Sequence, residues 1–351
     1  MTVRLGLVGT QYIGNLYMRS LEQVRGLEVA AVAAPNTAAG FAERWQIPAH
    51  YKDYRSMIEA TELDAVAIAT PNDLHYDITL AAADAGLHIL CEKPLALSLD
   101  EADTMIAACV RANVTFLYAE NLVFAPMYEG VRQAARRGSI GTPFLVKQAQ
   151  CHGGPYSPWF WDVERAGGGV LLDLGCHSIH AICRVMGEWP EAVTAHLGRY
   201  SHTGKTLGED HSTVLLHFSG NRLGIAENSW AMPGGNDYLE VYGPEGRLTA
   251  NLGQGPAIAA YRDPARDGAT PEKSGWLHYP YGGAWEFGFP QELQHFVDVI
   301  EGQVELQSSL ADGRRVLEII YAAYESARRG ERVALPFTSD REKPIDHWLE
   351  S

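Results

Sequence analysis

The chain has 351 residues, of which 46% are hydrophobic and 20% charged, and this length and composition predict two globular domains. Its formal net charge of -15 argues against nucleic acid or an anionic membrane surface as a partner. No apolar run approaches the roughly 20 residues that a membrane-spanning helix needs. The five cysteines are scattered and contain no Cys-x-x-Cys pair, which favours free thiols in a reducing cytoplasm.

Strand and helix patterns alternate through the first third of the chain. The predicted strands are the apolar, β-rich runs at residues 3–8, 27–33, 65–69, 88–91 and 115–119. Helical spacing and capping signals predict helices at residues 12–24, 37–45, 75–85 and 99–112. Residues 1–121 are therefore expected to form an α/β Rossmann domain with a doubly wound parallel sheet. Such a sheet binds ligands beyond the carboxyl ends of its strands.

A glycine turn, Gly9-Thr-Gln-Tyr-Ile-Gly14, follows the first strand, where a dinucleotide-binding fingerprint would read Gly-x-Gly-x-x-Gly. Gln11 replaces the middle glycine, and its amide is expected to donate to a phosphate oxygen instead. The acidic residue that binds the adenosine ribose in NAD enzymes would fall near Ala34, where no carboxylate stands. Asn36 and Thr37 can hydrogen-bond either cofactor, so charge selects neither NAD nor NADP.

Polar residues follow the later strands of this domain. Thr70-Pro71-Asn72 with His75 follows one strand, Glu92-Lys93-Pro94 follows the next, and Glu120-Asn121 follows the last. Lys93, fixed by the proline after it, is expected to point into the ligand crevice; the alternative is an ordinary surface-turn lysine. Burial there is expected to lower its pKa and make it a proton acceptor or a hydrogen-bond donor.

Consecutive predicted strands without helices between them characterise the remaining segment. These strands lie at residues 144–150, 193–197, 212–218, 223–228, 238–242 and 247–251. Helices are predicted at residues 126–136, 289–300 and 311–329. Residues 122–351 are therefore expected to form an α+β domain with a largely antiparallel, open-faced sheet. Because open sheet faces are often used for self-association, we expect a homodimer or a homotetramer.

A glycine run at residues 167–169 leads into a predicted helix that continues to Met186. Asp173, His177, His180 and Arg184 recur on one narrow stripe of that helix, whose other residues are mostly apolar. The stripe is interpreted either as a catalytic row or as a polar seam satisfied within the core. A metal site on the stripe is not expected, because no further cluster of ligand residues supports it.

An aromatic segment, Tyr156-Ser-Pro-Trp-Phe-Trp-Asp162, precedes the glycine run. Aromatic side chains in such a loop can stack on the C–H face of a polyhydroxylated ring, so Tyr156, Trp159 and Trp161 are candidate substrate contacts. The alternative is that these aromatics only anchor the loop to the protein.

Taken in chain order, these motifs resemble those of one known family. They are Gly9-x-x-x-Ile-Gly14, Ala69-Thr-Pro-Asn72 with His75, Cys91-Glu-Lys-Pro94, Gly167-Gly-Gly-x-Leu-x-Asp173-x-Gly-x-His177 and the closing Val333-x-Leu-Pro336. Over essentially its whole length the chain resembles the glucose–fructose oxidoreductase/inositol dehydrogenase/MocA family of NAD(P)-dependent sugar and polyol oxidoreductases. Its departures from the pattern are Gln11, Ala34 and His180, which stands where many members carry aspartate.

The resemblance implies NAD as cofactor, with NADP not excluded, and Lys93, Asp173 and His177 as the catalytic set. These three residues, with the aromatic candidates, are also the expected substrate contacts. We expect His177 to be the base and Lys93 to bind the same substrate oxygen. Asp173 is expected to bind a neighbouring hydroxyl and to bias the imidazole. The expected cofactor contacts are Gly9, Gln11, Tyr12, Ile13, Gly14, Ala34, Asn36, Thr70, Pro71, Asn72, His75, Glu92, Lys93 and Asn121.

Three functions are compatible with these residues. The first is a dehydrogenase that transfers hydride between nicotinamide and a secondary hydroxyl of a sugar, sugar derivative or cyclic polyol. The second is an NAD-dependent glycosidase, as in some relatives of the family, that oxidises a sugar transiently and eliminates the aglycone. The third is a non-catalytic NAD(P)-binding regulator.

Overall fold

A six-stranded parallel sheet forms the first half of the computed structural model, which describes residues 2–233, 235–251, 258–262, 275–279 and 287–349. The strand order is β3-β2-β1-β4-β5-β6, and all neighbours are parallel. The strands are β1 (Val3–Val8), β2 (Leu27–Ala33), β3 (Ala49–Tyr51), β4 (Ala65–Ile68), β5 (His88–Glu92) and β6 (Phe116–Ala119). The predicted doubly wound sheet is confirmed, and the short β3 is an addition that the sequence did not predict.

Helices cover both faces of this sheet. They are α1 (Tyr12–Ser20), α2 (Ala38–Trp45), α3 (Tyr54–Ala60), α4 (His75–Asp84) and α5 (Leu99–Ala112), with the short η1 (Leu21–Gln23), η2 (Asn72–Leu74) and η3 (Asn121–Val123). The predicted cap of α5 is present, because Ser98 Oγ accepts a hydrogen bond from the Glu101 backbone N–H at 3.0 Å. The strand order reverses between β1 and β4, and this reversal opens the ligand crevice.

A nine-stranded mixed sheet forms the second half, in the order β14-β13-β12-β11-β7-β10-β9-β8-β15. Its strands are β7 (Leu145–Cys151), β8 (Ala192–Gly198), β9 (His211–His217), β10 (Leu223–Ser229), β11 (Asn236–Gly243), β12 (Gly246–Asn251), β13 (Ile258–Arg262), β14 (Gly275–Tyr279) and β15 (Val333–Ala334). β7 and β10 are parallel and all other neighbours are antiparallel, as a largely antiparallel sheet requires.

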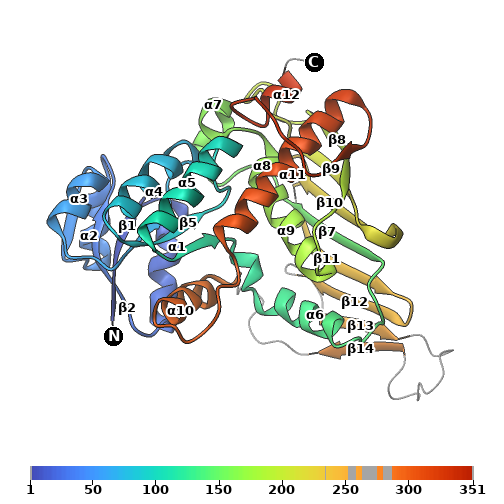
Figure 1. Cartoon of the computed structure of the whole chain (residues 1–351), viewed down its shortest axis with the longest axis horizontal. Helices are drawn as coiled ribbons and strands as arrows, with labels where there is room; N and C mark the ends of the chain where they lie inside the picture. The colour runs from blue at the N-terminus through green and yellow to red at the C-terminus, as the bar shows by residue number, and fades with distance from the viewer. Residues whose placement is uncertain (1, 234, 252–257, 263–274, 280–286, 350–351) are drawn as a thin grey trace.

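Helices α6 (Pro126–Arg136), α9 (Gly175–Met186) and α11 (Leu310–Arg329) pack on one face of this sheet, where alternate residues such as Val214 and Leu216 are buried. Figure 1 shows this sheet beside the first domain, with α9 and α11 between the two. The remaining elements are η4 (Pro158–Trp161), α7 (Val163–Ala166), α8 (Val170–Asp173), η5 (Ser219–Asn221), α10 (Phe289–Ile300) and α12 (Asp346–Leu349).

Helix α10 belongs to the second segment of the chain but packs beneath the first sheet, next to α1 (Figure 1). Its Leu293 and Phe296 are fully buried in one apolar cluster with Leu5 and Leu7 of β1. The domain boundary after residue 121 therefore stays a prediction, since the core of the first sheet is completed from outside it.

The single helix predicted from residue 170 to Met186 is wrong, because the chain forms α8 and α9 with Leu174 between them. In an unbroken helix the carbonyl of Asp173 would accept the backbone N–H of His177. Here that carbonyl accepts a hydrogen bond from Lys93 Nζ at 2.9 Å. The apolar periodicity continues through both helices, so it could not predict a break at a contact between distant segments.

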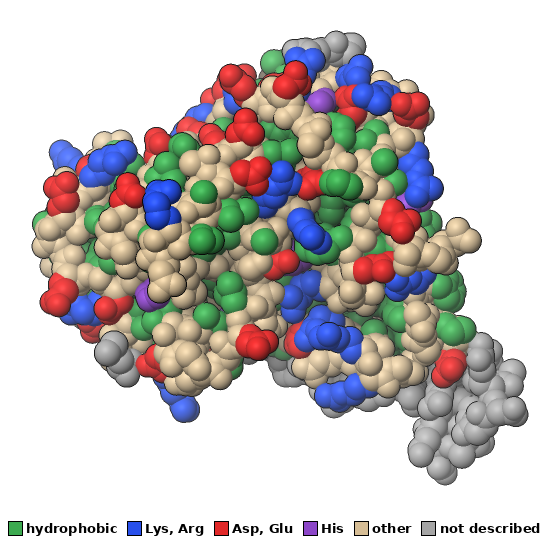
Figure 2. Space-filling model, in the orientation of Figure 1, with side chains coloured by type: hydrophobic (Ala, Val, Ile, Leu, Met, Phe, Trp, Pro, Cys, Tyr) green, Lys and Arg blue, Asp and Glu red, His purple; other side chains and the backbone are tan. Residues whose placement is uncertain are grey.

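The surface carries charges of both signs. On the face shown in Figure 2, acidic and basic side chains are interspersed. No helix within the described part of the chain is long and apolar enough to cross a membrane. All five cysteines are buried as free thiols.

Candidate active site

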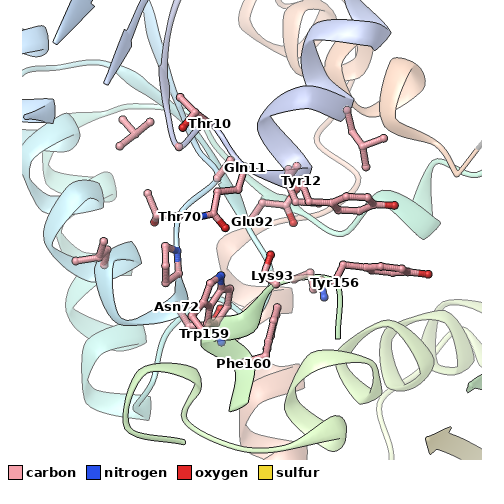
Figure 3. A pocket seen from close by; sticks show the side chains of 18 of the residues that line it. Thr10, Gln11, Tyr12, Thr70, Asn72, Glu92, Lys93, Tyr156, Trp159 and Phe160 are labelled. Atoms are coloured by element: carbon pink, nitrogen blue, oxygen red, sulfur yellow. The ribbon is translucent and has the colours of Figure 1, made fainter. Parts of the chain in front are cut away.

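A cavity of about 1090 Å³ runs from the turn after β1 to the end of α8 and the start of α9. It lies at the carboxyl ends of the parallel strands, as the switch-point rule predicts. In Figure 3, Lys93 lies between the residues of the first turn and the aromatic segment of the second domain. The cavity therefore has a cofactor end, at the first turn, and a chemistry end, around Lys93.

Lys93 and Asp173 form a buried ion pair at the chemistry end. Lys93 Nζ donates hydrogen bonds to Asp173 Oδ1 and to the Asp173 carbonyl, both at 2.9 Å. The other carboxylate oxygen of Asp173 accepts the indole N–H of fully buried Trp230 at 3.2 Å. The pair is thus held by a tryptophan that the sequence did not single out.

The pKa expected for Lys93 from burial alone is wrong in direction. Burial lowers the pKa of this ammonium, but the charge of Asp173 and its hydrogen bond more than offset that effect and raise the pKa well above its ordinary value. Lys93 therefore stays protonated at neutral pH and acts as a donor. An ammonium group has three N–H donors, and Asp173 takes two of them.

His177 contacts a different carboxylate from the one expected. Its Nδ1 donates to Glu120 Oε1 in a close hydrogen bond, whereas Asp173 is engaged with Lys93. Burial raises the pKa of Glu120, but the neighbouring His177 outweighs this effect and lowers the pKa overall. Glu120 is fully buried, and its second oxygen lies 3.8 Å from Nδ1 of His180. Since a carboxylate only accepts, Nδ1 of His177 is the donor in this bond, and in the neutral imidazole Nε2 is the free nitrogen.

Glu120 and His177 are 57 residues apart in the sequence. Glu120 directly follows the carboxyl end of β6, and His177 lies on α9 of the second domain. The sequence signal for Glu120 was its place directly after a predicted strand, but nothing local indicated its partner.

The glycine turn at the cofactor end depends on two glycines. Gly9 has a φ of +110°, and a Cβ there would lie 2.1 Å from the Ala69 carbonyl oxygen. A Cβ at Gly14 would lie 2.5 Å from the Gly9 carbonyl oxygen, so Gly14 lets α1 pack closely on the turn without lining the cavity. Gln11 is the exposed N-cap of α1 and its side chain makes no capping bond, which leaves its amide free for a ligand.

The polar residues that follow the later strands differ in whether they line the cavity. Asn72 and Asn121 line the cavity, but their amide groups donate to the carbonyls of Ala166 at 2.8 Å and Phe287 at 2.6 Å. His75 is fully buried between the carbonyls of Pro94 and Thr70, outside the cavity lining. His75 therefore fixes two of the strand-end loops and does not reach the cavity itself. The other expected cofactor contacts that line the cavity are Gly9, Gln11, Tyr12, Ile13, Ala34, Asn36, Thr70, Pro71, Glu92 and Lys93.

Some side chains of the aromatic segment line the cavity, as substrate contacts would, and others only pack against the protein. Tyr156 and Trp159 line the cavity, and Tyr156 stacks on Tyr12 with ring centroids 4.9 Å apart (Figure 3). Trp161 does not line the cavity; it packs edge-on against Trp230 with centroids 5.4 Å apart. Phe160, which was not selected, lines the cavity with Lys93 Nζ 6.0 Å from its ring centroid.

The remaining lining residues that sequence reasoning missed come from helix α1 and from strands and loops of both domains. They include Arg19, Lys52, Gln150, His152 and Asp237. His180 and Arg184 lie outside this lining, and Arg184 donates to the Gln307 carbonyl at 2.6 Å. Among the residues that the structure describes, no group of three or more His, Cys, Asp or Glu side chains is arranged to hold a metal.

Comparison with known proteins assigns both halves of the chain. A family model described as an oxidoreductase family with an NAD-binding Rossmann fold matches residues 3–120. The model of the GFO/IDH/MocA C-terminal domain matches residues 128–249. The chain belongs to the GFO/IDH/MocA oxidoreductase family. Its first domain is accordingly an NAD-binding Rossmann domain, as the resemblance implied.

Several members of the GFO/IDH/MocA family are similar over most of the chain. The levoglucosan dehydrogenase of Pseudarthrobacter phenanthrenivorans is 30% identical, with 88% of this chain and 89% of the relative covered. The myo-inositol 2-dehydrogenase of Thermotoga maritima is 26% identical, with 95% and 98% covered. The crystal structure of GenD2 from gentamicin A biosynthesis, in complex with NAD, has a TM-score of 0.83 and 28% identity, and 96% of this chain and 97% of that one are covered.

The cofactor end fits NAD on the observations above. Glycine at position 9 lets the turn pack directly against the Ala69 carbonyl, and the unpaired N–H groups of the first turn of α1 begin at the cavity wall. Ala34 itself contributes no carboxylate, and the lining also includes Asn36, Thr37 and, directly after the neighbouring strand β3, Lys52 and Asp53.

Proposed function

We propose that the protein is an NAD-dependent dehydrogenase acting on a secondary hydroxyl of a sugar, a sugar derivative or a cyclic polyol. The observation that carries this proposal is the meeting of the Lys93–Asp173 ion pair and the hydrogen-bonded Glu120–His177 pair at one end of an NAD-type cavity. The names of its relatives, levoglucosan dehydrogenase and myo-inositol 2-dehydrogenase, support the substrate class.

His177 is the proposed general base. With Nδ1 bonded to Glu120, Nε2 is the free nitrogen, and it takes the proton from the substrate hydroxyl. The buried negative charge of Glu120 stabilises the imidazolium that forms and fixes the orientation of the ring. Glu120, not Asp173, therefore has the orienting role that we first assigned to Asp173.

Lys93 is the proposed donor to the same substrate oxygen. It is permanently charged, and its third N–H is not taken by Asp173. A fixed positive charge beside the oxygen stabilises the negative charge that develops as the proton leaves. Asp173 holds the ammonium in position and lines the cavity, where it can accept a neighbouring hydroxyl.

Bound NAD supplies the hydride-accepting nicotinamide ring in this chemistry. The turn from Gly9 to Gly14, the residues Thr70 to Asn72 and Glu92 would hold it on the side of the parallel sheet. On the opposite side, Trp159 and Phe160 stack on one another with centroids 3.8 Å apart and exclude water from the chemistry end.

The test is a panel of sugars, glycosides and cyclitols added to the protein with NAD, with reduced nicotinamide followed by its absorbance. We expect net reduction by at least one polyol, and a loss of roughly 10²-fold or more in turnover for His177→Ala and Lys93→Ala. The exposed His50→Ala variant is the control and should behave as wild type.

The rival functions give other results in the same panel. Aglycone release from a glycoside without net change in NAD would identify the glycosidase. No change with any compound, or full turnover in both variants, would contradict the dehydrogenase and leave the regulator.

We also propose that the enzyme forms a homodimer or homotetramer in the cytoplasm. The face of the second sheet opposite α9 and α11 carries half-buried residues such as Leu215 and Ile225, which suits self-association. The five free thiols suit a reducing compartment. A monomer in light scattering or sedimentation would contradict the oligomer.

A further inference from the structure

A row of polar residues crosses the inner, helix-facing side of the second sheet at its cavity end. Ser212 of β9 pairs with Asn228 of β10, Asn228 pairs with Gln150 of β7, and Gln150 pairs with Asp237 of β11. Directly opposed residues share one face of a sheet, so the four side chains form one continuous row. The next row on the same face is fully buried and consists of Val214, Ala226, Gln148 and Leu239, of which only Gln148 is polar.

One half of this row is satisfied within the protein. The Asn228 amide donates to Ser212 Oγ at 3.3 Å, and its oxygen accepts Ser178 Oγ of α9 at 2.5 Å. Both Asn228 and Ser212 are fully buried. This half ties the sheet to α9 and needs no ligand.

The other half, Gln150 and Asp237, lines the cavity. Gln150 is only 8% exposed, and its side-chain oxygen has no hydrogen-bond partner among the described residues. A buried amide without a partner is costly, which indicates that a ligand group completes its bonding. A half-turn of the amide exchanges its oxygen and nitrogen, so either can face the ligand.

Asp237 brings a negative charge to the same wall. Its Oδ1 accepts one hydrogen bond, from the Cys151 backbone N–H at 3.3 Å. Within the described ranges, no lysine, arginine or histidine pairs with it; Lys93 is engaged by Asp173, and Arg165 by Asp73. Burial raises the pKa of Asp237 to about 6, so the carboxylate is ionised at neutral pH although nothing neutralises it.

We propose that Gln150 and Asp237 form a binding site for a protonated amino group on the substrate ring. An ammonium offers three N–H donors, which matches a carboxylate beside an amide oxygen. It also supplies the positive charge that Asp237 lacks, which a hydroxyl at the same place does not. This inference rests on the proposed function, because it takes the chemistry end as the place where the substrate ring binds, and it narrows the substrate class to amino sugars and aminocyclitols.

The test measures binding, so it does not depend on turnover. Methyl α- and β-D-glucopyranoside, myo-inositol and their monoamino analogues at each ring carbon are titrated into the enzyme with saturating NADH, at neutral pH, by calorimetry. Methyl glycosides cannot ring-open, and alcohols cannot be oxidised by the NADH complex. We expect at least one amine to bind about tenfold or more tightly than its hydroxyl counterpart.

Asp237→Asn should reduce that preference to within about twofold while leaving NADH binding and thermal stability close to wild type. The exposed Asp84→Asn variant also removes one negative charge and is the control, which should keep the preference. Gln150→Leu should weaken the amine and its counterpart together.

Two results would overturn the inference: no amine bound more tightly than its counterpart, or a preference that survives in Asp237→Asn. Either result leaves the proposed function intact if the panel with NAD still gives reduction that depends on His177 and Lys93. Absence of that reduction, with amine binding present, would overturn the proposed function alone.

Discussion

The two ends of the cavity are built on different principles. At the chemistry end each basic candidate is held by a carboxylate, as Lys93 is by Asp173 and His177 by Glu120. At the cofactor end, Gly9 lets the turn approach the Ala69 carbonyl, and Ala34 stands where the ribose-binding carboxylate was expected, although Asp53 also lines the cavity. The contrast indicates that charge directs the reaction at one end, whereas space and backbone N–H groups admit the cofactor at the other.

The largest expected effect comes from breaking a charge pair at the chemistry end. Glu120→Gln keeps the shape of the side chain but removes the charge that supports the His177 imidazolium. We expect turnover to fall by about 10³-fold while the Kd for NAD stays within about twofold of wild type. Stopped-flow turnover and fluorescence titration of NAD measure the two quantities.

His180→Asn is the matched control for this change. His180 faces the other oxygen of Glu120 at 3.8 Å and does not line the cavity. A loss in His180→Asn as large as that in Glu120→Gln would mean that Glu120 does not act through His177.

The next effect tests the cofactor end, where space is expected to matter more than charge. Gly9→Ala places a methyl group 2.1 Å from the Ala69 carbonyl oxygen at a φ of +110°. We expect NAD binding about 100-fold weaker and a lower melting temperature, because the turn must move. Gly40→Ala is the control, since its Cβ meets nothing within 4 Å on α2, and it should be neutral or slightly stabilising.

A smaller effect is expected from the residue that anchors the glycine run. Glu209 is fully buried, and its carboxylate accepts the Leu171 backbone N–H and the Tyr324 hydroxyl, both at 2.8 Å. Burial raises the pKa of Glu209 to about 7, so the folded protein binds this proton more tightly than the unfolded chain does. The stabilisation that protonated Glu209 gives the folded protein is therefore complete below about pH 4.3, the pKa of a glutamate in the unfolded chain. It is lost as the pH rises through about 7.

In the wild type, ionisation of Glu209 lowers the free energy of unfolding between about pH 4.5 and 7.5. In Glu209→Gln this decrease should be smaller by roughly 2–3 kcal/mol. Urea unfolding of variant and wild type at the two pH values measures the difference. Exposed Glu43→Gln is the control, and an equal flattening in both variants would assign the effect to overall charge.

The smallest expected effect comes from adding a carboxylate at position 34 of the cofactor end. Ala34→Asp restores the carboxylate that normally binds the ribose hydroxyls and should repel the 2′-phosphate of NADP. We expect the ratio of NAD to NADP affinity to rise about tenfold, measured by titration with each cofactor. An unchanged ratio would show that residue 34 does not face the adenosine ribose.

The cofactor end was predictable from sequence because its signals are local. The turn from Gly9 to Gly14 follows a buried strand directly, and strand–helix alternation alone fixes the edge of the sheet to which Thr70, Lys93 and Asn121 belong. Capping signals likewise located α5, where Ser98 and Glu101 form the predicted box.

The chemistry end was only partly predictable, because its pairs join distant segments. Nothing near Glu120 indicates His177, and nothing near Lys93 indicates that Asp173 would reverse the effect of burial on its pKa. The same bond, from Lys93 to the Asp173 carbonyl, breaks the helix that periodicity had predicted as continuous. Trp161 was misjudged for a related reason, since its packing partner Trp230 lies in another strand connection.

The packing of α10 beneath the first sheet has a consequence for how the chain acquires its structure during synthesis. Leu293 and Phe296 complete the apolar cluster around Leu5 and Leu7, so the earliest strand made waits for one of the last helices. Until residues 289–300 are made, the part of this sheet face that α10 covers remains exposed to water, although α1 and α2 pack on the same face. The cofactor domain is therefore translated first and finished almost last.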